Sequence, residues 1–154
     1  MKITYAKNNV RIYGAEEKVT FFNKDFLNLE FNNNVDFVFL APPWGGIDYS
    51  TDEDYSLMKS VKPDIMKIME KSWQVSEKII LCLPRNINVE EILGILTESA
   101  QKSGRKIDRA AVEIEKIYLN NKFKLNLVYF GNSSKVNFFF FFLKQILKKD
   151  FEIN

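Results

Sequence analysis

A proline-rich turn at residues 41–46 carries the residue types with the clearest chemical use in this chain. The string Ala41-Pro42-Pro43-Trp44-Gly45-Gly46 directly follows an apolar run, Val35 to Leu40. Two successive prolines have no backbone N–H to donate, so they form a stiff bend whose carbonyl groups remain available as acceptors. An exocyclic amino group can donate twice to such carbonyls, the tryptophan offers a flat face, and the glycines let a planar ring approach closely. The turn therefore suits a planar amine; the alternative is a rigid surface loop whose tryptophan packs as an ordinary core residue.

The composition excludes several kinds of active site. Among 154 residues there is no histidine and one cysteine. Catalytic triads and dyads with histidine, a histidine general base and imidazole metal ligands are therefore impossible. One cysteine cannot form an internal disulfide or a four-thiolate zinc site, so we expect an intracellular protein without a metal. Any chemistry must use carboxylates, backbone groups, aromatic faces or a bound cofactor.

Charge and hydrophobicity are those of an ordinary soluble domain. Lys and Arg number 22 against 20 Asp and Glu, which is too balanced to indicate nucleic-acid binding by itself. The most apolar run, Phe138 to Leu143, is far shorter than the roughly 20 residues that a membrane-spanning helix needs. No signal-peptide pattern precedes Val10. We expect no membrane partner and one domain.

Hydrophobic spacing predicts the elements that would hold the turn. A helix is expected over Ile3 to Tyr13 with Gly14 as its C-terminal glycine, and a short strand over Lys18 to Phe22. Asn32-Asn33-Asn34 reads as a turn. The apolar run Val35 to Leu40 is typical of a central parallel strand that is buried on both faces.

The second half of the chain alternates helix and strand before a hairpin. Pro63 suits the first turn of a helix. The residues expected on the inward face of this helix are Ile65, Ile68, Met69, Ser72 and Trp73. A buried strand is expected at Lys78–Leu83 and a helix at Val89–Ser103, followed by Gly104. The inward residues of this helix are expected to be Ile92, Leu93, Leu96 and Ala100. A hairpin is expected from Val112–Leu119 and Phe123–Phe130. This order predicts an α/β domain around a mostly parallel sheet.

Residues Asp36 to Tyr49 resemble the catalytic loop of the trimethylguanosine synthase family. These are S-adenosylmethionine-dependent RNA cap guanine-N2 methyltransferases of the Rossmann-like class I fold. The resemblance continues in the family's order through Ala6-Lys7-Asn8-Asn9 with Tyr13-Gly14, Asp25-Phe26, Leu83-Pro84-Arg85-Asn86, Leu119-Asn120-Asn121-Lys122 and Tyr129-Phe130-Gly131. It covers roughly residues 2–131, so a partial methyltransferase domain is expected at 1–131 and an extension of unknown role at 132–154.

The resemblance implies a catalytic turn made of Pro42, Pro43 and Trp44. Trp44 would stack on the cationic 7-methylguanine of the cap, an attraction worth roughly 0.5 to 2 kcal/mol. The Pro42 carbonyl would hold the N2 amine with its lone pair toward the sulfonium methyl group. Such a transfer depends on positioning, because the cofactor provides the reactive group.

Further site residues follow from the same resemblance. Asn9 would hydrogen-bond the base, Tyr49 would contact the cap, and Arg85 would bind a cap phosphate, since a guanidinium suits phosphate. Asp25, Phe26 and Ala41 would bind the cofactor, the first two through hydrogen bonding to its adenine and stacking on it. The implied cofactor is S-adenosylmethionine, the implied partner a capped small RNA, and the implied location the nucleus.

Two departures from the family pattern affect what is expected. Ala41 stands where the family has serine, and relatives acting on other amines have Asn or Asp, so a side-chain acceptor for the amine is lost. The family's glycine-rich cofactor loop and the acidic residue after its second strand have no counterpart here. In the class I strand order 3-2-1-4-5-7-6, strands 1 and 2 would be missing, and Val35–Leu40 would have an unpaired edge. We expect the C-terminal portion of a methyltransferase domain, with tight binding of S-adenosylmethionine requiring the missing N-terminal segment.

Three functions remain open on the sequence. The first is a cap guanine-N2 methyltransferase that converts 7-methylguanosine caps to 2,2,7-trimethylguanosine. The second is a catalytically inactive module that binds the cap or RNA through Trp44, Asn9 and Arg85. The third is a methyltransferase that acts on another planar amine.

Overall fold

The computed structural model describes residues 2–31, 35–45, 55–105 and 112–131. Internal contacts divide the chain into two compact units, Met1–Glu30 and Phe31–Asn154, and each is described by itself. The expected turn Asn32-Asn33-Asn34, Tyr49 and the run Phe138 to Phe142 lie outside the described residues.

The first unit contains one α-helix and two short 3-10 helices. Helix α1 spans Lys2–Ile12 and is followed by Gly14 at φ 60°, which confirms the expected helix and its C-terminal glycine. The 3-10 helices are η1, Glu16–Lys18, and η2, Phe26–Asn28. The strand expected over Lys18–Phe22 is wrong. Val19 has extended dihedrals, but no described strand pairs with this segment, and a strand needs a neighbour for its backbone hydrogen bonds.

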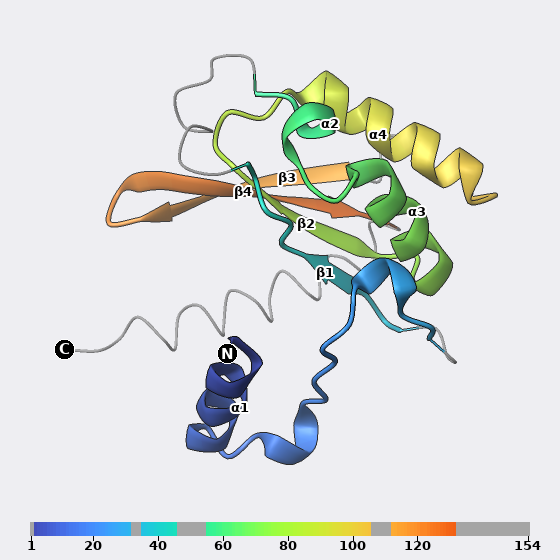
Figure 1. The fold of residues 1–154 in the computed structure, drawn as a ribbon. Helices are drawn as coiled ribbons and strands as arrows, with labels where there is room; N and C mark the ends of the chain where they lie inside the picture. Colours follow the sequence, from blue (N-terminus) through green and yellow to red (C-terminus); the bar gives the residue numbers. More distant parts are fainter. Residues whose placement is uncertain (1, 32–34, 46–54, 106–111, 132–154) are drawn as a thin grey trace. The chain divides into compact units, whose positions relative to one another are not determined.

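The second unit is built on a four-stranded mixed sheet (Figure 1). Its strands are β1, Val38–Leu40; β2, Ile79–Leu83; β3, Val112–Leu119; and β4, Lys122–Phe130. Their order is β1-β2-β4-β3, with β1 parallel to β2 and β4 antiparallel to both of its neighbours. This order corresponds to strands 4-5-7-6 of the class I arrangement. The α/β class and the C-terminal hairpin are confirmed. The expectation of a mostly parallel sheet is wrong for the described strands, because only β1 and β2 pair in parallel and both pairings of β4 are antiparallel.

Strand β1 is shorter and more exposed than the sequence predicts. It has three residues, and among the described strands it is hydrogen-bonded only to β2. Phe39 is 49% exposed, whereas Leu40 is 8% exposed, so the expectation of burial on both faces is wrong. The residue types are those of a central strand, but burial depends on what covers each face. The expected unpaired edge is found on β1 among the described strands, and its assignment to the missing strands 1 and 2 of the class I order stays a prediction.

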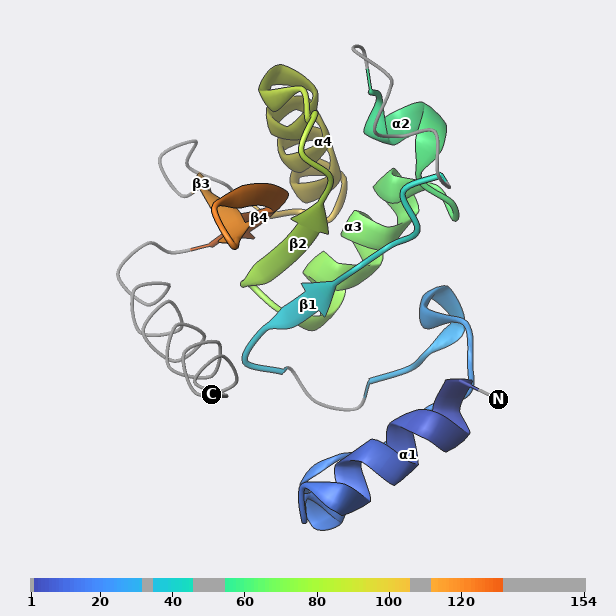
Figure 2. The same cartoon turned by 90° about the vertical axis from the view of Figure 1, so that its left-hand side faces the viewer.

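Three helices accompany the sheet: α2, Leu57–Ser60; α3, Ile65–Val75; and α4, Val89–Lys102. Helices α3 and α4 lie side by side on the same face of the sheet (Figure 2). The predicted inward residues of α3 are all buried, and in α4 only Leu93 is half-buried instead. Pro63 precedes the N-cap Asp64 and is not within the first turn, because the Asp64 carboxylate accepts from the Met66 N–H at 2.8 Å.

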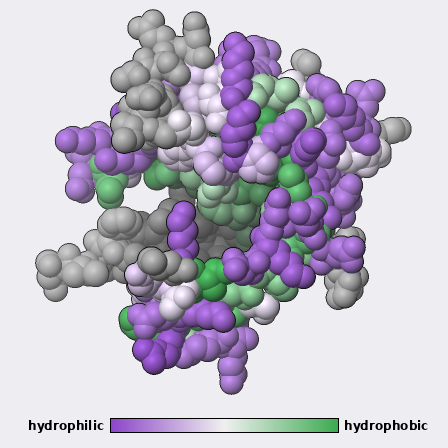
Figure 3. Space-filling view, viewed as in Figure 1, coloured by the Kyte–Doolittle hydropathy of each residue, from purple (hydrophilic) through white to green (hydrophobic). Residues whose placement is uncertain are grey.

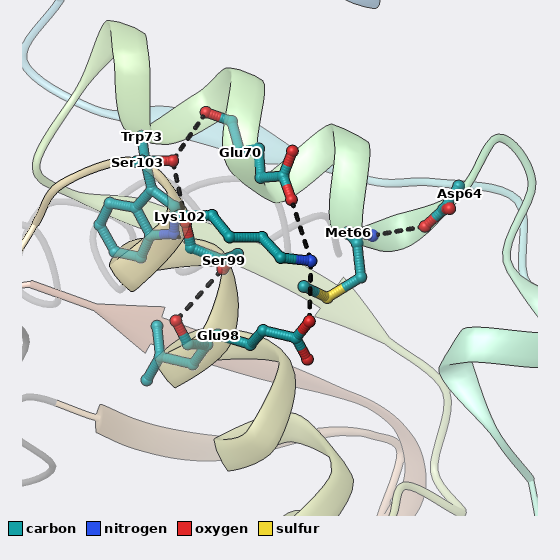
Figure 4. A network of polar contacts seen from close by, with 9 residues as sticks. Asp64, Met66, Glu70, Trp73, Glu98, Ser99, Lys102 and Ser103 are labelled. Carbon is teal, nitrogen blue, oxygen red and sulfur yellow. Dashed lines mark hydrogen bonds and ion pairs between the residues drawn. The ribbon is translucent and has the colours of Figure 1, made fainter.

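Helices α3 and α4 are joined by polar contacts as well as by apolar packing (Figure 4). The buried Trp73 indole N–H donates to the hydroxyl of Ser99 at 3.0 Å, which satisfies a polar group inside the core. At the surface, the Lys102 ammonium lies 2.7 Å from Glu98 and 3.7 Å from Glu70. In the space-filling view, hydrophilic residues (purple) cover much of the helical layer, with hydrophobic residues (green) visible between them (Figure 3).

The hairpin of β3 and β4 turns through two asparagines. Asn120 and Asn121 have φ values of 49° and 58°, which is the left-handed region that a two-residue hairpin turn requires and that asparagine tolerates. The strands pair from Val112 with Phe130 to Leu119 with Lys122. The opposite end of β4 carries the residues that pair with β2, so the hairpin is attached directly to the strand that precedes α4.

Candidate functional site

The predicted catalytic turn lies where two parallel strands end. Strands β1 and β2 run parallel with Leu40 opposite Leu81, so residues 41–45 and 84–88 leave the sheet at the same edge. In open α/β sheets, ligands bind outside the carboxyl ends of the strands. The structure therefore brings together five predicted site residues at this edge: Ala41, Pro42, Pro43, Trp44 and Arg85.

Trp44 is held through both its side chain and its backbone. Its indole Nε1 donates to the carbonyl oxygen of Cys82 in β2 at 3.0 Å. Its own carbonyl oxygen accepts from the Tyr55 hydroxyl at 3.1 Å. The side chain is half-buried, so it combines a fixed orientation with partial access to solvent. This arrangement can present an aromatic ring to a planar ligand without first ordering the side chain.

Gly45 is required where the turn leaves Trp44. Its φ is 98°, a conformation that residues with a side chain rarely adopt. A Cβ atom there would also lie 3.3 Å from the backbone oxygen of Ser60. The turn therefore passes close to α2, and a larger residue would displace it.

Tyr55 and Glu91 form the support behind the turn. Tyr55 is 2% exposed, and burial, together with the nearby Glu91 carboxylate, raises the pKa of its hydroxyl to about 12. The Glu91 carboxylate accepts from Ser56 Oγ at 2.6 Å and from the N–H of Leu57 at 2.8 Å, and it lies 3.4 Å from the Met58 nitrogen. Glu91 thus connects α4 to the start of α2.

A cavity of about 490 Å³ lies between these elements. Its lining residues come from the start of α2, the loop after β2 and the first turn of α4: Tyr55, Ser56, Lys59, Asn86, Ile87, Asn88 and Glu91. Several of their polar groups are already bonded within the protein, because Ser56 donates to Glu91 and Asn88 accepts from the Glu91 N–H. The cavity is therefore the polar junction of α2 and α4.

The loop that carries Arg85 is fixed by a buried side chain from the hairpin. Asn126 of β4 is 1% exposed, and its amide nitrogen donates to the carbonyl oxygens of Pro84 at 2.6 Å and Arg85 at 3.3 Å. Arg85 itself is exposed. Its guanidinium is thus accessible while its backbone is held in place.

Apart from Tyr49, the remaining predicted site residues lie in the first unit, and their grouping with the turn stays a prediction. Asn9 is exposed on α1. The Asp25 carboxylate caps η2 by accepting from the Leu27 N–H at 3.0 Å, and Phe26 is the first residue of η2. The second oxygen of Asp25 has no hydrogen-bond partner within residues 2–30, so it can accept from an amino group. A carboxylate acceptor beside an aromatic ring fits the chemistry of an adenine.

Sequence reasoning missed Tyr55, Glu91 and Asn126. Glu91 follows the N-cap Asn88 by three residues, which is the spacing of a capping box, but its carboxylate bonds to another segment and not to its own helix start. Asn126 interrupts the apolar end of β4, and a polar residue in such a run is a signal for a buried hydrogen bond. Nothing local distinguishes Tyr55.

The described residues contain neither a cluster of possible metal ligands nor a helix that could span a membrane. The part of the chain placed by the structure contains no group of three or more side chains suited to hold a metal ion. No helix in these same ranges has both the length and the apolar character needed to cross a membrane.

Comparisons with known proteins point to one family. The family described as RNA cap guanine-N2 methyltransferase matches residues 1–133. The trimethylguanosine synthase of Schizosaccharomyces pombe is 36% identical over 99 residues, which are 60% of this chain and 41% of the relative. The Saccharomyces cerevisiae trimethylguanosine synthase is 28% identical over 90 residues, 54% of this chain and 29% of the relative. The matched region thus spans less than half the length of either relative.

Proposed function

The chain belongs to the RNA cap guanine-N2 methyltransferase, or trimethylguanosine synthase, family, and from that premise we propose that it binds the 7-methylguanosine cap of small RNAs. The proposed reaction is transfer of two methyl groups to N2 of the guanine, one from each of two S-adenosylmethionine molecules, with loss of one N2 proton each time, which gives 2,2,7-trimethylguanosine caps. The nuclear location implied by the resemblance stays a prediction.

The observation that supports this proposal best is the double attachment of Trp44. Its indole is bonded to Cys82 and its carbonyl to Tyr55, at the carboxyl edge of the sheet. A methylated guanine is cationic, and the attraction of a cation to a tryptophan face is worth roughly 0.5 to 2 kcal/mol. A pre-oriented Trp44 is thus suited to select 7-methylguanine over guanine.

The other residues of the turn act on the amine. The Pro42 carbonyl accepts a hydrogen bond from the N2 amino group, and Pro43 keeps the bend stiff. The amine is thereby held in one orientation. S-adenosylmethionine, when bound, supplies the electrophilic methyl group. Exposed Arg85, at the same edge, binds a cap phosphate. Asn9 and Tyr49 complete the cap contacts in this proposal.

The chain's own candidates for the cofactor adenine are Asp25 and Phe26. The second Asp25 oxygen accepts from the amino group of the adenine, and Phe26 stacks on its ring. Ala41 lies next to the reacting groups and offers no side-chain acceptor. The orientation of the amine therefore depends on backbone carbonyls.

The test compares two ligands and one substitution. We expect the chain to bind 7-methylguanosine triphosphate about two- to thirtyfold more tightly than guanosine triphosphate, and Trp44→Ala to abolish that preference. Isothermal titration calorimetry measures both affinities. Trp73→Phe is the matched control, because Trp73 is buried against Ser99 in the helical layer. Equal affinity of the parent chain for both nucleotides would contradict the proposal and favour another planar amine.

Methyl transfer itself separates an enzyme from a cap-binding module. Because this chain alone is not expected to bind S-adenosylmethionine tightly, the labelled cofactor is supplied at high concentration with 7-methylguanosine triphosphate, and label at N2 is the outcome expected of an enzyme. Selective cap binding with no transfer under any cofactor concentration would assign the chain to the cap-binding class. The replacement Ala41→Ser, which restores the family's acceptor, is expected to raise the transfer rate and to leave cap affinity unchanged.

A further inference from the structure

The position of Trp44 depends on a chain of contacts that starts at α4. Glu91 in the first turn of α4 binds Ser56 and the Leu57 N–H, and the residue before Ser56 is Tyr55, whose hydroxyl bonds to the Trp44 carbonyl. The contacts thus span three separate segments of the sequence. Each hydrogen bond in this series fixes the position of the next residue, from Glu91 to the start of α2 and from Tyr55 to Trp44.

Glu91 is directed away from its usual local partner. Asn88 caps α4 by accepting from the Glu91 N–H at 3.1 Å, and in a capping box the glutamate would reach back to the N–H of Asn88. Here the carboxylate instead accepts from Ser56 Oγ and the Leu57 N–H. A charged group that binds two donors of another segment holds that segment more strongly than a neutral acceptor does.

Tyr55 is suited to act as a permanent donor. It is buried, and its pKa is raised to about 12, so the hydroxyl keeps its proton near neutral pH. Its partner is a backbone carbonyl, which can only accept. The bond to Trp44 therefore has a fixed direction.

We propose that Tyr55 and Glu91 are positioning residues, which set the orientation of Trp44 and thereby the selectivity for a methylated, cationic guanine. This inference rests on the proposed function of Trp44 in stacking. Neither residue touches the ligand. Tyr55 acts on the turn through the Trp44 carbonyl, and Glu91 acts through Tyr55 by fixing the start of α2.

The experiment uses the full 154-residue chain labelled with ¹⁵N. The chain has two tryptophans, so two indole N–H signals are expected, and Trp44→Phe assigns them. Trp73 serves as an internal reference, because it is bonded to Ser99 within the helical layer. The heteronuclear NOE of each indole reports its mobility without any ligand. Titration with 7-methylguanosine triphosphate and with guanosine triphosphate then gives the selectivity.

Tyr55→Phe and Glu91→Gln each remove one link while keeping the shape of the side chain. We expect the NOE of Trp44, and not that of Trp73, to fall in both variants. The affinity for 7-methylguanosine triphosphate should fall about three- to tenfold, the range that loss of one hydrogen bond produces. Matched controls are Tyr118→Phe, an exposed tyrosine on β3, and Glu98→Gln, an exposed glutamate on α4.

The outcomes separate this inference from the proposed function. A lower melting temperature with an unchanged Trp44 NOE and unchanged selectivity would show a purely structural role and overturn the inference. A parent chain that does not distinguish the two nucleotides would overturn the proposed function, and the inference about selectivity with it. If the parent chain is selective and both variants keep that selectivity, only the inference fails.

Discussion

The indole nitrogen of Trp44 lies 3.0 Å from the carbonyl oxygen of Cys82, so the turn after β1 is bonded to the strand β2 beside it. The two residues are 38 positions apart in the sequence. This bond fixes the plane of the indole relative to the sheet, in addition to any packing around the ring. The predictions below follow from this contact and from the others that hold the same edge.

The Arg85 guanidinium is expected to recognise phosphate. Arg85→Ala should weaken binding of 7-methylguanosine triphosphate about tenfold and leave binding of the 7-methylguanosine nucleoside unchanged, since only the triphosphate carries the negatively charged phosphate groups. Calorimetric titration at two salt concentrations measures this, and the difference should shrink at higher salt. Lys67→Ala, an exposed lysine on α3, is the control. An equal loss for both ligands would show that Arg85 does not bind phosphate.

Asn126 is expected to stabilise the loop that carries Arg85. Asn126→Ala leaves the carbonyl oxygens of Pro84 and Arg85 without this donor, which should lower the free energy of unfolding by about 1–3 kcal/mol. Urea denaturation measures the change. Lys124→Ala, an exposed residue on the same strand, should change it by less than about 0.5 kcal/mol. Identical unfolding midpoints for the two variants would contradict the role given to Asn126.

The buried and exposed contacts between α3 and α4 should differ in strength. Ser99→Ala leaves the buried indole N–H of Trp73 without its acceptor and should cost about 1–3 kcal/mol of unfolding free energy. Lys102→Ala removes ion pairs with Glu98 and Glu70 at the surface, where the expected cost is below about 1 kcal/mol. Thermal unfolding followed by near-ultraviolet circular dichroism ranks the two variants. If Lys102→Ala lowered the stability more than Ser99→Ala, the surface ion pairs would contribute more than the buried hydrogen bond, which would contradict this prediction.

Stability is expected to fall at high pH because two buried tyrosines hold their protons. Burial raises the pKa of Tyr55 to about 12, and burial with the hydrogen bond to Glu115 raises the pKa of Tyr129. Below pH 10 both tyrosines are protonated in the folded and unfolded states. Above it the unfolded chain loses these protons first, so the free energy of unfolding decreases by at most about 1.4 kcal/mol per pH unit for each group.

Urea denaturation at pH 8 and at about pH 11 tests this expectation. Tyr55→Phe and Tyr129→Phe should each reduce the loss of stability between the two pH values. Tyr118→Phe should not, because Tyr118 is 59% exposed. The difference between variant and parent removes the effect of lysines, which titrate in the same range. An unchanged pH dependence in both variants would mean that these hydroxyls titrate alike in the folded and unfolded chain.

The sequence predicted those helices and turns whose formation depends on residues that are near one another in the chain. The helices at Lys2–Ile12, Ile65–Val75 and Val89–Lys102 have apolar spacing and flanking residues that act within a few positions, and the hairpin follows from two adjacent asparagines. The prediction of a strand at Lys18–Phe22 was wrong because a strand forms only when it is hydrogen-bonded to a neighbouring strand. The local sequence pattern does not show which segment that neighbour would be. The exposure of Phe39 was missed for the same reason.

The turn of the candidate site could be predicted, but its support could not. The Pro42-Pro43-Trp44 string is unusual enough to be noticed locally. Tyr55 and Glu91 act through bonds to residues 11 and 34 positions away. Such bonds depend on how α2 and α4 pack, which follows from the whole fold.

The contact between Asn126 and Pro84 also sets an order of events during folding. The two residues are 42 positions apart, and Asn126 reaches the loop only when β4 has paired with β2. Helix α4 can form earlier, because its backbone hydrogen bonds join residues that are near in sequence. During synthesis, the ribosome adds Asn126 well after Arg85, so the loop takes its final conformation late. The edge proposed to bind the cap is thus completed by β4, the last of the described strands in the sequence.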